Sequence, residues 1–138
     1  MPLDGKQWLA RDVAKLLWDN GWLNAENLMI MVAVLQAESA LFEKAWNFNP
    51  PTSTFPKGSY DRGIFQLNDQ GKQGAEQTAF RDMAYDPYKA VKVARPMYEK
   101  RSFSPWYAYK NGAWEKFIPQ ATVAVCNMLR VMHGVKPI

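Results

Sequence analysis

The apolar positions near the start of the chain recur at helical spacing. They fall on one face of a helix and comprise Leu9, Val13, Leu16 and Leu17. Asp4 followed three positions later by Gln7 predicts a capping pair for this helix. Asn20-Gly21 predicts its end. We therefore expect a first amphipathic helix that closes at about Gly21.

The next apolar stretch has no polar face. Asn24 predicts the N-cap of a second helix, which runs to about Ser39. Apolar side chains occur on nearly every side of it: Leu28, Met29, Ile30, Met31, Val32, Val34 and Leu35. A helix that is apolar all round is normally buried in the middle of a domain, so we expect this one at the centre of the fold.

The middle of the chain predicts the β structure. Residues 42–63 are rich in helix breakers, among them Pro50, Pro51 and Gly58, and this composition predicts a loop that can include a short hairpin. Residues 63–68 alternate like a short strand or an extended wall segment. A short helix is expected over about 76–83.

Proline positions the remaining helices. Asp86-Pro87 is an N-cap followed by proline in the first turn, which predicts a helix start. Pro96 lies inside the same helix and should kink or divide it. Residues 102–118 are aromatic and irregular, and Pro119 then opens a last helix that ends before Gly134. The whole pattern predicts a mainly helical, α+β chain with a small β element.

Length and charge narrow the function classes. With 138 residues, of which 48% are apolar, the chain fits one domain over 1–138 with a real core. A net charge of +4 favours approach to anionic surfaces, but no run of Lys and Arg is interleaved with aromatics, which argues against nucleic-acid binding. No apolar run reaches the roughly 20 residues that span a bilayer. The start Met1-Pro2-Leu3-Asp4 lacks the pattern of a signal peptide.

The single cysteine and the single histidine argue against disulfide, reactive-thiol and zinc chemistry. Cys126 has no partner for an internal disulfide, and its apolar helical surroundings favour a buried, inert thiol. His133 follows that helical stretch, and we interpret it as a positive charge at the end of the helix. One Cys and one His argue against a zinc site of the Cys/His type. We expect neither a metal nor a cofactor.

Glu38 is the residue whose position suggests chemistry. It lies at the end of the most apolar helix, where the negative end of the helix dipole and apolar neighbours would both raise its pKa. A carboxylic acid still protonated near neutral pH can give a proton to the leaving sugar oxygen in glycosidic cleavage. Taken alone, Glu38 is better interpreted as a residue that has simply reached solvent at a helix end.

Asp61 strengthens the catalytic interpretation of Glu38. It follows Glu38 after the Pro- and Gly-rich loop, close to Gly63. Two carboxylates that flank a cleft could serve as acid and as nucleophile, base or electrostatic stabiliser. An isolated Asp near a Gly would more often form a turn.

Four ordered segments resemble the lysozyme-like superfamily. They are Ala37-Glu38-Ser39, Ser59-Tyr60-Asp61-Arg62-Gly63-Ile64-Phe65-Gln66-Leu67-Asn68, Asp86-Pro87, and residues 103–113. In that superfamily a helix ends in Glu, and a Gly-hydrophobe-hydrophobe-Gln segment forms the facing wall. The segments look most like lysozyme-like domains of bacteriophage lysins and tail proteins, and the resemblance spans about Leu28 to Phe117. It implies a lysozyme-like orthogonal helical bundle with the small β element beside a catalytic cleft.

The resemblance also implies roles for the matching residues. Glu38 would be the general acid, and Gln66 and Asn68 would line the sugar subsites. Tyr109 matches a tyrosine that lies near the catalytic Glu of transglycosylases. Trp106 could stack on sugar, or could equally be a buried anchor.

Asp61 aligns with the second carboxylate of animal-type lysozymes, a position that many transglycosylases lack. It therefore favours hydrolysis slightly over lytic transglycosylation. The chain departs from animal-type lysozymes in its lack of disulfides, in Pro96, and in a longer loop between Glu38 and Asp61. The longer loop leaves the role of Asp61 open.

The leading hypothesis is cleavage of the β-1,4 bond between N-acetylmuramic acid and N-acetylglucosamine in bacterial peptidoglycan, by a muramidase (lysozyme) or a lytic transglycosylase. The alternative is a non-catalytic wall-binding or phage tail module that keeps the fold without turnover. Without a signal peptide, the resemblance suggests two routes to the wall. The domain would be part of a larger virion protein, or a phage lysin released from the host cytoplasm by a separate pore-forming partner. Nothing specific supports an inhibitor-like or toxin-like domain.

Overall fold

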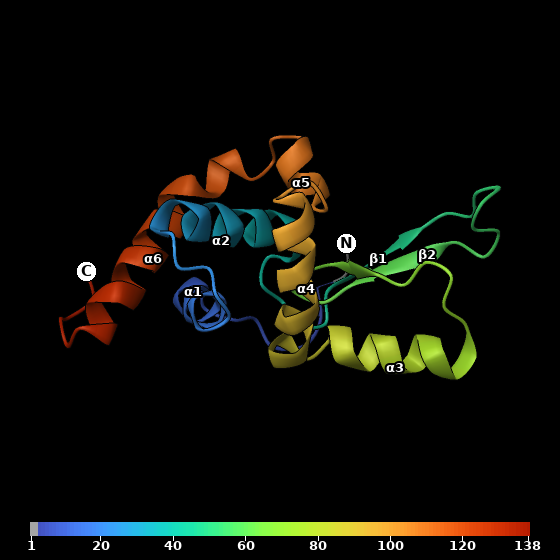
Figure 1. Ribbon diagram of the computed structural model, residues 1–138, viewed down its shortest axis with the longest axis horizontal. Helices are drawn as coiled ribbons and strands as arrows, with labels where there is room; N and C mark the ends of the chain where they lie inside the picture. The colour runs from blue at the N-terminus through green and yellow to red at the C-terminus, as the bar shows by residue number, and fades with distance from the viewer. Residues whose placement is uncertain (1–2) are drawn as a thin grey trace.

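The computed structural model describes residues 3–138 and has a mainly helical α+β architecture (Figure 1). Met1 and Pro2, which belong to the stretch where no signal peptide is expected, lie outside the described residues. The elements are α1 (Ala10–Asp19), α2 (Ala25–Ser39), β1 (Trp46–Asn49), β2 (Ser59–Arg62), β3 (Leu67–Asn68), α3 (Gly74–Ala84), α4 (Pro87–Arg101), α5 (Tyr107–Lys110), a 3-10 turn η1 (Glu115–Phe117) and α6 (Ile118–Met132). The predicted fold class is confirmed.

Helix α2 forms the centre of the helical part, as its apolar pattern predicted. It contacts α1, α5, η1 and α6, and its side chains from Met31 to Leu35 are fully buried. The Asn24 side chain accepts a hydrogen bond of 3.0 Å from the Asn27 N–H, which confirms the predicted N-cap. The helix is therefore capped at its start and buried in the core through its middle turns.

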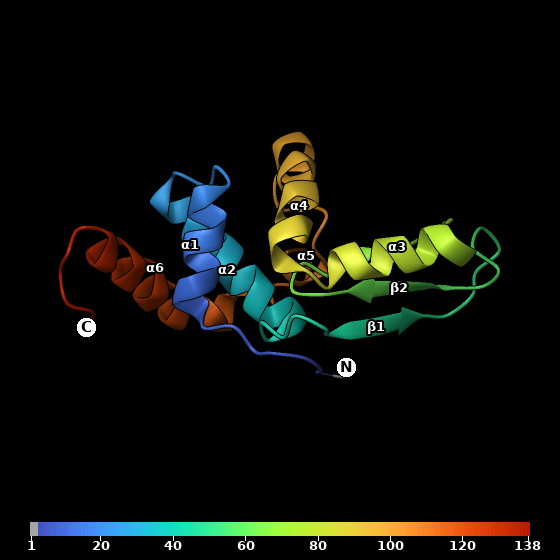
Figure 2. The same cartoon turned by 90° about the horizontal axis from the view of Figure 1, so that it is seen from below.

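The β structure is a three-stranded antiparallel sheet in the order β1-β2-β3. The hairpin considered within residues 42–63 is present as β1 and β2. Of residues 63–68, Leu67 and Asn68 form β3, whereas residues 63–66 form a turn instead of continuing the strand. In both views the hairpin extends away from α1, α2 and α6, and α3 lies along it (Figures 1 and 2).

The predicted capping pair of Asp4 and Gln7 is wrong. Helix α1 begins only at Ala10, and its N-cap Leu9 makes no side-chain cap. The preceding segment is instead held against the turn after α2, because Gln7 forms a β-bridge with Phe42 and its side chain donates to the Ala40 carbonyl at 2.9 Å. This tertiary pairing moves the helix start by a full turn.

Pro96 does not divide α4, which runs without interruption from Pro87 to Arg101. Proline removes only one helical hydrogen bond, and packing holds the helix on both sides of it. Val91 is fully buried before Pro96, and after it Tyr98 packs against Trp22 with ring centres 5.2 Å apart. The predicted start of this helix is confirmed, since the Asp86 side chain accepts from two backbone N–H groups.

One further prediction is wrong, because residues 102–118, expected to be irregular, contain the short helix α5 and the turn η1. The remaining predictions fall close to the observed elements. Helix α3 covers the segment predicted at 76–83, and α6 carries a proline in its first turn, as expected from Pro119. Cys126 on α6 is half-buried, less enclosed than predicted. His133 caps the C-terminal end of α6. Within residues 3–138, no helix combines the length and apolarity needed to cross a bilayer.

Candidate active site

A cleft of about 520 Å³ lies between the end of α2, the sheet and α5. Its lining is polar and comprises Glu38, Asn47, Asn49, Asp61, Gln66, Asn68, Gln70 and Tyr107. Four residues singled out from the sequence, Glu38, Asp61, Gln66 and Asn68, thus meet in one place. Two carboxyl groups among amide side chains are suited to polar, hydroxyl-rich ligands.

The unusual end of α2 fixes the position of Glu38. Ala40 and Leu41 are both left-handed, with φ of 50° and 65°, a conformation that costs free energy for residues with a side chain. The buried Ser39 compensates locally, because its Oγ donates to the Leu35 carbonyl at 3.0 Å and accepts from the Leu41 N–H at 3.2 Å. The chain therefore turns sharply just after Glu38 and leaves the carboxyl group in the cleft.

Burial raises the pKa of Glu38 above its ordinary value of 4.5. A hydrogen bond of 2.7 Å from the Ala108 N–H to Glu38 Oε1 acts in the opposite direction, and the negative charge of Asp61 adds to the rise. The net effect of these three contributions is an increase in the pKa of Glu38. Glu38 thus keeps its proton to higher pH than a solvent-exposed glutamate does.

Asp61 is held by two asparagines from the neighbouring strands. The Asn68 Nδ2 donates to Asp61 Oδ1 at 2.8 Å, and the Asn49 Nδ2 donates to Asp61 Oδ2 at 3.0 Å. Both amides also donate to the Ser59 Oγ, at 3.0 and 3.4 Å. The carboxylate is therefore oriented from both sides, and the strand register that pairs Asp61 with Asn68 and Asn49 with Ser59 produces this arrangement.

The turn between β2 and β3 positions Gln66. Its backbone is left-handed, with φ of 48°, and its Nε2 donates to the carbonyls of Gly63 at 2.9 Å and Ala45 at 3.2 Å. Gly63 allows this turn to approach the end of α3, because a Cβ at this position would lie 2.0 Å from the Ala84 carbonyl oxygen. The wall of the cleft therefore depends on a glycine that no other residue can replace without movement.

The two aromatic residues chosen from the sequence lie outside the cleft lining. Trp106 is only 2% exposed, and its Nε1 donates to the Phe65 carbonyl at 3.0 Å. This is the placement of a buried anchor, with no free face for a sugar. Tyr109 packs between Phe103 and Trp114, with ring centres 5.0 and 5.5 Å away.

Sequence reasoning missed Asn47, Asn49, Gln70 and Tyr107 among the cleft residues. The two asparagines lie in the segment 42–63, which the sequence predicted only as a loop that can include a hairpin. Their spacing of two residues would place both on one face of a strand. In the structure both lie on β1, and Asn47 is paired with Asp61 on β2. Tyr107 is 71% exposed at the start of α5, and no pattern in the sequence separates it from Tyr109.

The chemistry available in the cleft is that of carboxyl groups and amides. One carboxyl group has a raised pKa and the other is held by two hydrogen-bond donors, which is the combination that acid-assisted cleavage of an acetal bond uses. Among residues 3–138, no group of three or more His, Cys, Asp and Glu side chains gathers as metal ligands would.

The helices, the three-stranded sheet and the intervening cleft define a lysozyme-like α+β fold. The chain is similar to lysozyme c-1 of Anopheles gambiae, with 29% identity over 118 residues that cover 80% of this chain and 79% of the insect protein. No protein-family model and no solved structure matches the chain. The similarity extends over most of the length of both proteins.

Proposed function

We propose that this protein cleaves the glycan strands of bacterial peptidoglycan at the β-1,4 bond between N-acetylmuramic acid and N-acetylglucosamine. The observation that carries the proposal is the pairing of Glu38, whose pKa is raised by burial, with the oriented carboxylate of Asp61 in one polar cleft. The similarity to an insect lysozyme supports the same substrate class. The described chain would act as one lysozyme-like catalytic domain.

In this mechanism Glu38 is the general acid. Its protonated carboxyl group gives a proton to the glycosidic oxygen while the bond from that oxygen to the sugar C1 breaks. The Ala108 N–H, bonded to Oε1, fixes the direction of the carboxyl group. Asp61 would stabilise the positive charge that develops on the sugar, or attack C1 directly.

The second half of the reaction distinguishes two enzymes. In a lysozyme, water attacks the sugar C1 and its proton returns to the ionised Glu38. In a lytic transglycosylase, the 6-hydroxyl of the muramic acid attacks instead and forms an anhydro product. The carboxylate of Asp61, hydrogen-bonded through both oxygens, favours hydrolysis slightly.

The amides of the cleft would bind the substrate. Gln66 is oriented by its bonds to two backbone carbonyls, and Gln70 and Asn47 are exposed at the rim. Hydroxyl and acetamido groups of the sugars are matched donors and acceptors for such side chains. The exposed ring of Tyr107 is better placed for contact with a sugar than the buried Trp106.

Mass spectrometry of the fragments that the protein releases from purified peptidoglycan tests the proposal. Fragments with reducing-end muramic acid would identify a lysozyme, and anhydro-muramic fragments a transglycosylase. Glu38→Gln should release neither. Glu26→Gln, which alters an exposed glutamate at the other end of α2, is the matched control and should be fully active.

Full activity of Glu38→Gln would contradict the assignment of the acid. No fragments from the unaltered protein, on walls of several bacterial types, would favour a non-catalytic wall-binding or tail module. We further propose that the protein reaches its substrate as part of a virion or with a separate pore-forming partner. Detection of the chain in purified phage particles by mass spectrometry would separate these two routes.

A further inference from the structure

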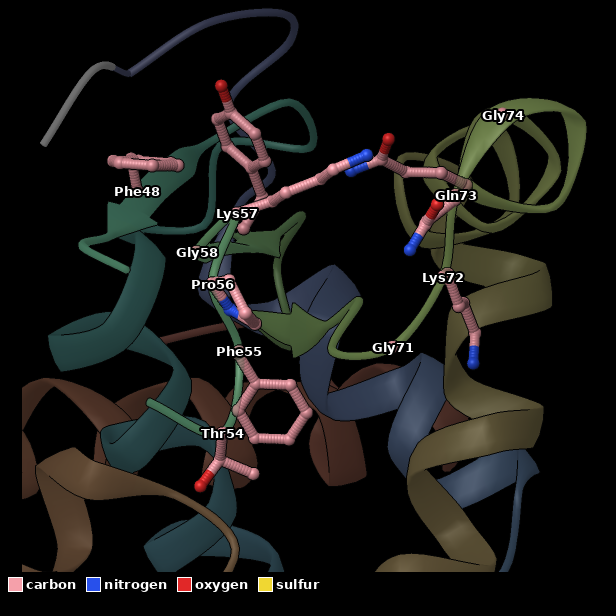
Figure 3. Close-up of a pocket in the computed structure, with 12 residues that line it drawn as sticks. Phe48, Thr54, Phe55, Pro56, Lys57, Gly58, Gly71, Lys72, Gln73 and Gly74 are labelled. Carbon is pink, nitrogen blue, oxygen red and sulfur yellow. The ribbon is translucent and has the colours of Figure 1, made fainter. Parts of the chain in front are cut away.

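A second and larger pocket, of about 760 Å³, lies outside the candidate active site. It is formed by residues 54–58 at the hairpin tip, by Phe48 and Tyr60 on the strands, and by residues 71–74 and Gln77 where α3 begins (Figure 3). Its volume is within the range of small-molecule sites, about 300–1,000 Å³. The function proposed above makes no use of it.

The strands separate the two pockets, since successive strand residues point to opposite faces. Asn49 and Asp61 line the cleft, whereas their neighbours Phe48 and Tyr60 line the second pocket. The linings of the two pockets adjoin at the turn after β3, where Gln70 lines the cleft and its neighbour Gly71 lines the second pocket. A group attached to a ligand in the cleft could therefore reach the second pocket by passing over the rim formed by Gln70 and Gly71.

The lining of the second pocket combines aromatic rings with positive charge. Phe48 is 40% exposed and packs against Tyr60 with ring centres 5.0 Å apart, while Phe55 from the hairpin tip is half-buried. The lining residues, all within the described part of the chain, include Lys57 and Lys72 but no aspartate or glutamate.

Lys57 is the cation best placed to meet a ligand. It is exposed, and its side chain extends from the hairpin across the opening toward Gln73 (Figure 3). Lys72 is partly engaged, because its ammonium lies 5.0 Å from the centre of the Phe80 ring and 4.0 Å from Glu76 Oε1. The pocket is thus matched to a ligand that carries both carboxylates and aliphatic or amide groups.

We propose that this pocket binds the peptide stem of peptidoglycan, which rests on the function proposed above. The stem is attached to muramic acid, so a strand in the cleft brings it to the rim at Gln70 and Gly71. Its carboxylates, on D-glutamate and diaminopimelate, would pair with Lys57 and Lys72. Its alkyl groups would pack on Phe48 and Phe55.

The test uses a free stem peptide, N-acetyl-L-alanyl-γ-D-glutamyl-meso-diaminopimelate, and the whole protein. Binding is followed by ¹⁵N NMR, with the amide signals of Gly58, Gly71 and Gly74 as reporters of this pocket. The paired variant Lys57→Gln/Lys72→Gln should weaken binding about five- to tenfold, as expected for two exposed ion pairs. Added salt should weaken binding of the unaltered protein in the same direction.

Lys136→Gln is the control for a change of charge away from the pocket, since it removes an exposed positive charge in the C-terminal tail, at the opposite end of the molecule from the hairpin (Figure 1). It should bind the peptide as the unaltered protein does. Phe55→Ala should weaken binding without changing the charge, and this variant separates a specific pocket from a general attraction of anions.

Three results would overturn the proposal: no shift of the three glycine signals with the peptide, equal affinity in all variants, or displacement of the peptide by chito-oligosaccharides or glycerol phosphate polymers. The readout does not depend on cleavage. A protein that binds the peptide but releases no wall fragments would contradict the catalytic function alone, while one that cleaves the wall without binding the peptide would contradict only this inference.

Discussion

The carboxyl group of Glu38 accepts a hydrogen bond of 2.7 Å from the backbone N–H of Ala108, a residue 70 positions further along the chain. This bond joins the end of α2 to the start of α5. Because a backbone donor cannot rotate away as a side chain can, the orientation of Glu38 depends on the docking of α5. The buried Trp106, just before α5, supports that docking through its bond to Phe65.

The raised pKa of Glu38 predicts how stability depends on pH. Since the folded state holds the proton more tightly than the unfolded chain, this group stabilises the fold below its ordinary pKa of 4.5, and the contribution is lost as pH rises through the raised pKa. Glutamine does not ionise, so the Glu38→Gln protein does not lose this stabilisation as pH rises. Its unfolding temperature should exceed that of the unaltered protein at neutral pH, with a difference that shrinks below pH 4.5.

Calorimetry at several pH values measures this difference. The gain of Glu38→Gln at neutral pH should be larger than that of Glu26→Gln, at the exposed start of the same helix. A Glu38→Gln protein that is less stable than the unaltered protein at neutral pH would argue that the charged form is favoured by its surroundings.

The hydrogen bonds around Asp61 predict a loss of activity without a loss of the fold. Asn68→Ala removes donors to Asp61 and Ser59, and should lower the turnover rate about tenfold or more while costing about 1–2 kcal/mol of stability. Asn47→Ala is the comparison, because Asn47 lines the same cleft and pairs with Asp61 through the strand register, whereas the side-chain donors to Asp61 are Asn49 and Asn68; its effect should fall on the KM and not on the turnover rate. Equal effects of the two changes would show that orientation of Asp61 does not matter.

Gly63→Ala should destabilise the protein strongly. The new methyl group would meet the Ala84 carbonyl oxygen at 2.0 Å, and the backbone φ of 81° is unfavourable for alanine. We expect a cost of about 3 kcal/mol or more in urea unfolding. Gly71 has nearly the same φ, 79°, but nothing within 4 Å of an added Cβ, so Gly71→Ala should cost only about 1–2 kcal/mol.

The comparison of Gly63→Ala with Gly71→Ala separates steric overlap from backbone strain. If both cost the same, the close approach to α3 is relieved by small movements. In that case Gly63→Ala should still disturb the cleft, since the Gly63 carbonyl accepts from Gln66, and the turnover rate would report it.

Tyr107 and Tyr109 should respond differently to alanine substitution. Tyr107→Ala removes an exposed ring from the cleft and should raise the KM for glycan fragments several-fold with little change in stability. Tyr109→Ala removes a ring packed against Phe103 and Trp114, so it should lower stability by about 1–3 kcal/mol and leave KM nearly unchanged. The reverse pattern would return Tyr109 to the substrate site.

Periodicity and capping residues predicted the longer helices, but not the short helix α5 and the turn η1. Asn24 and Asp86 cap helices as expected, because such caps depend on neighbours within a few residues. Gln7 failed as a cap because its partner, Ala40, lies 33 positions away. The continuity of α4 through Pro96 likewise depends on packing of Tyr98 against Trp22, which is distant in the sequence.

The carboxyl groups of the site could be found from the sequence, but their supports could not. Glu38 stands out at the end of an apolar helix, and Asp61 was matched by the resemblance. Asn49 becomes a partner of Asp61 only through the pairing of β1 with β2, and the loop between the two strands hides this pairing from the sequence. Trp106 was equally compatible with a surface and a core position until its burial was known.

The alternation of side chains on β2 also restricts how this protein can change over evolutionary time. Insertion of one residue between Ser59 and Tyr60 would exchange the faces on which the next two residues lie, turning the Tyr60 ring into the cleft and the Asp61 carboxylate into the neighbouring pocket. Within the β1–β2 hairpin, length changes are therefore tolerable only in residues 50–58, between the paired segments. We expect homologues to differ in length within residues 50–58 and to keep the register of the paired strand residues.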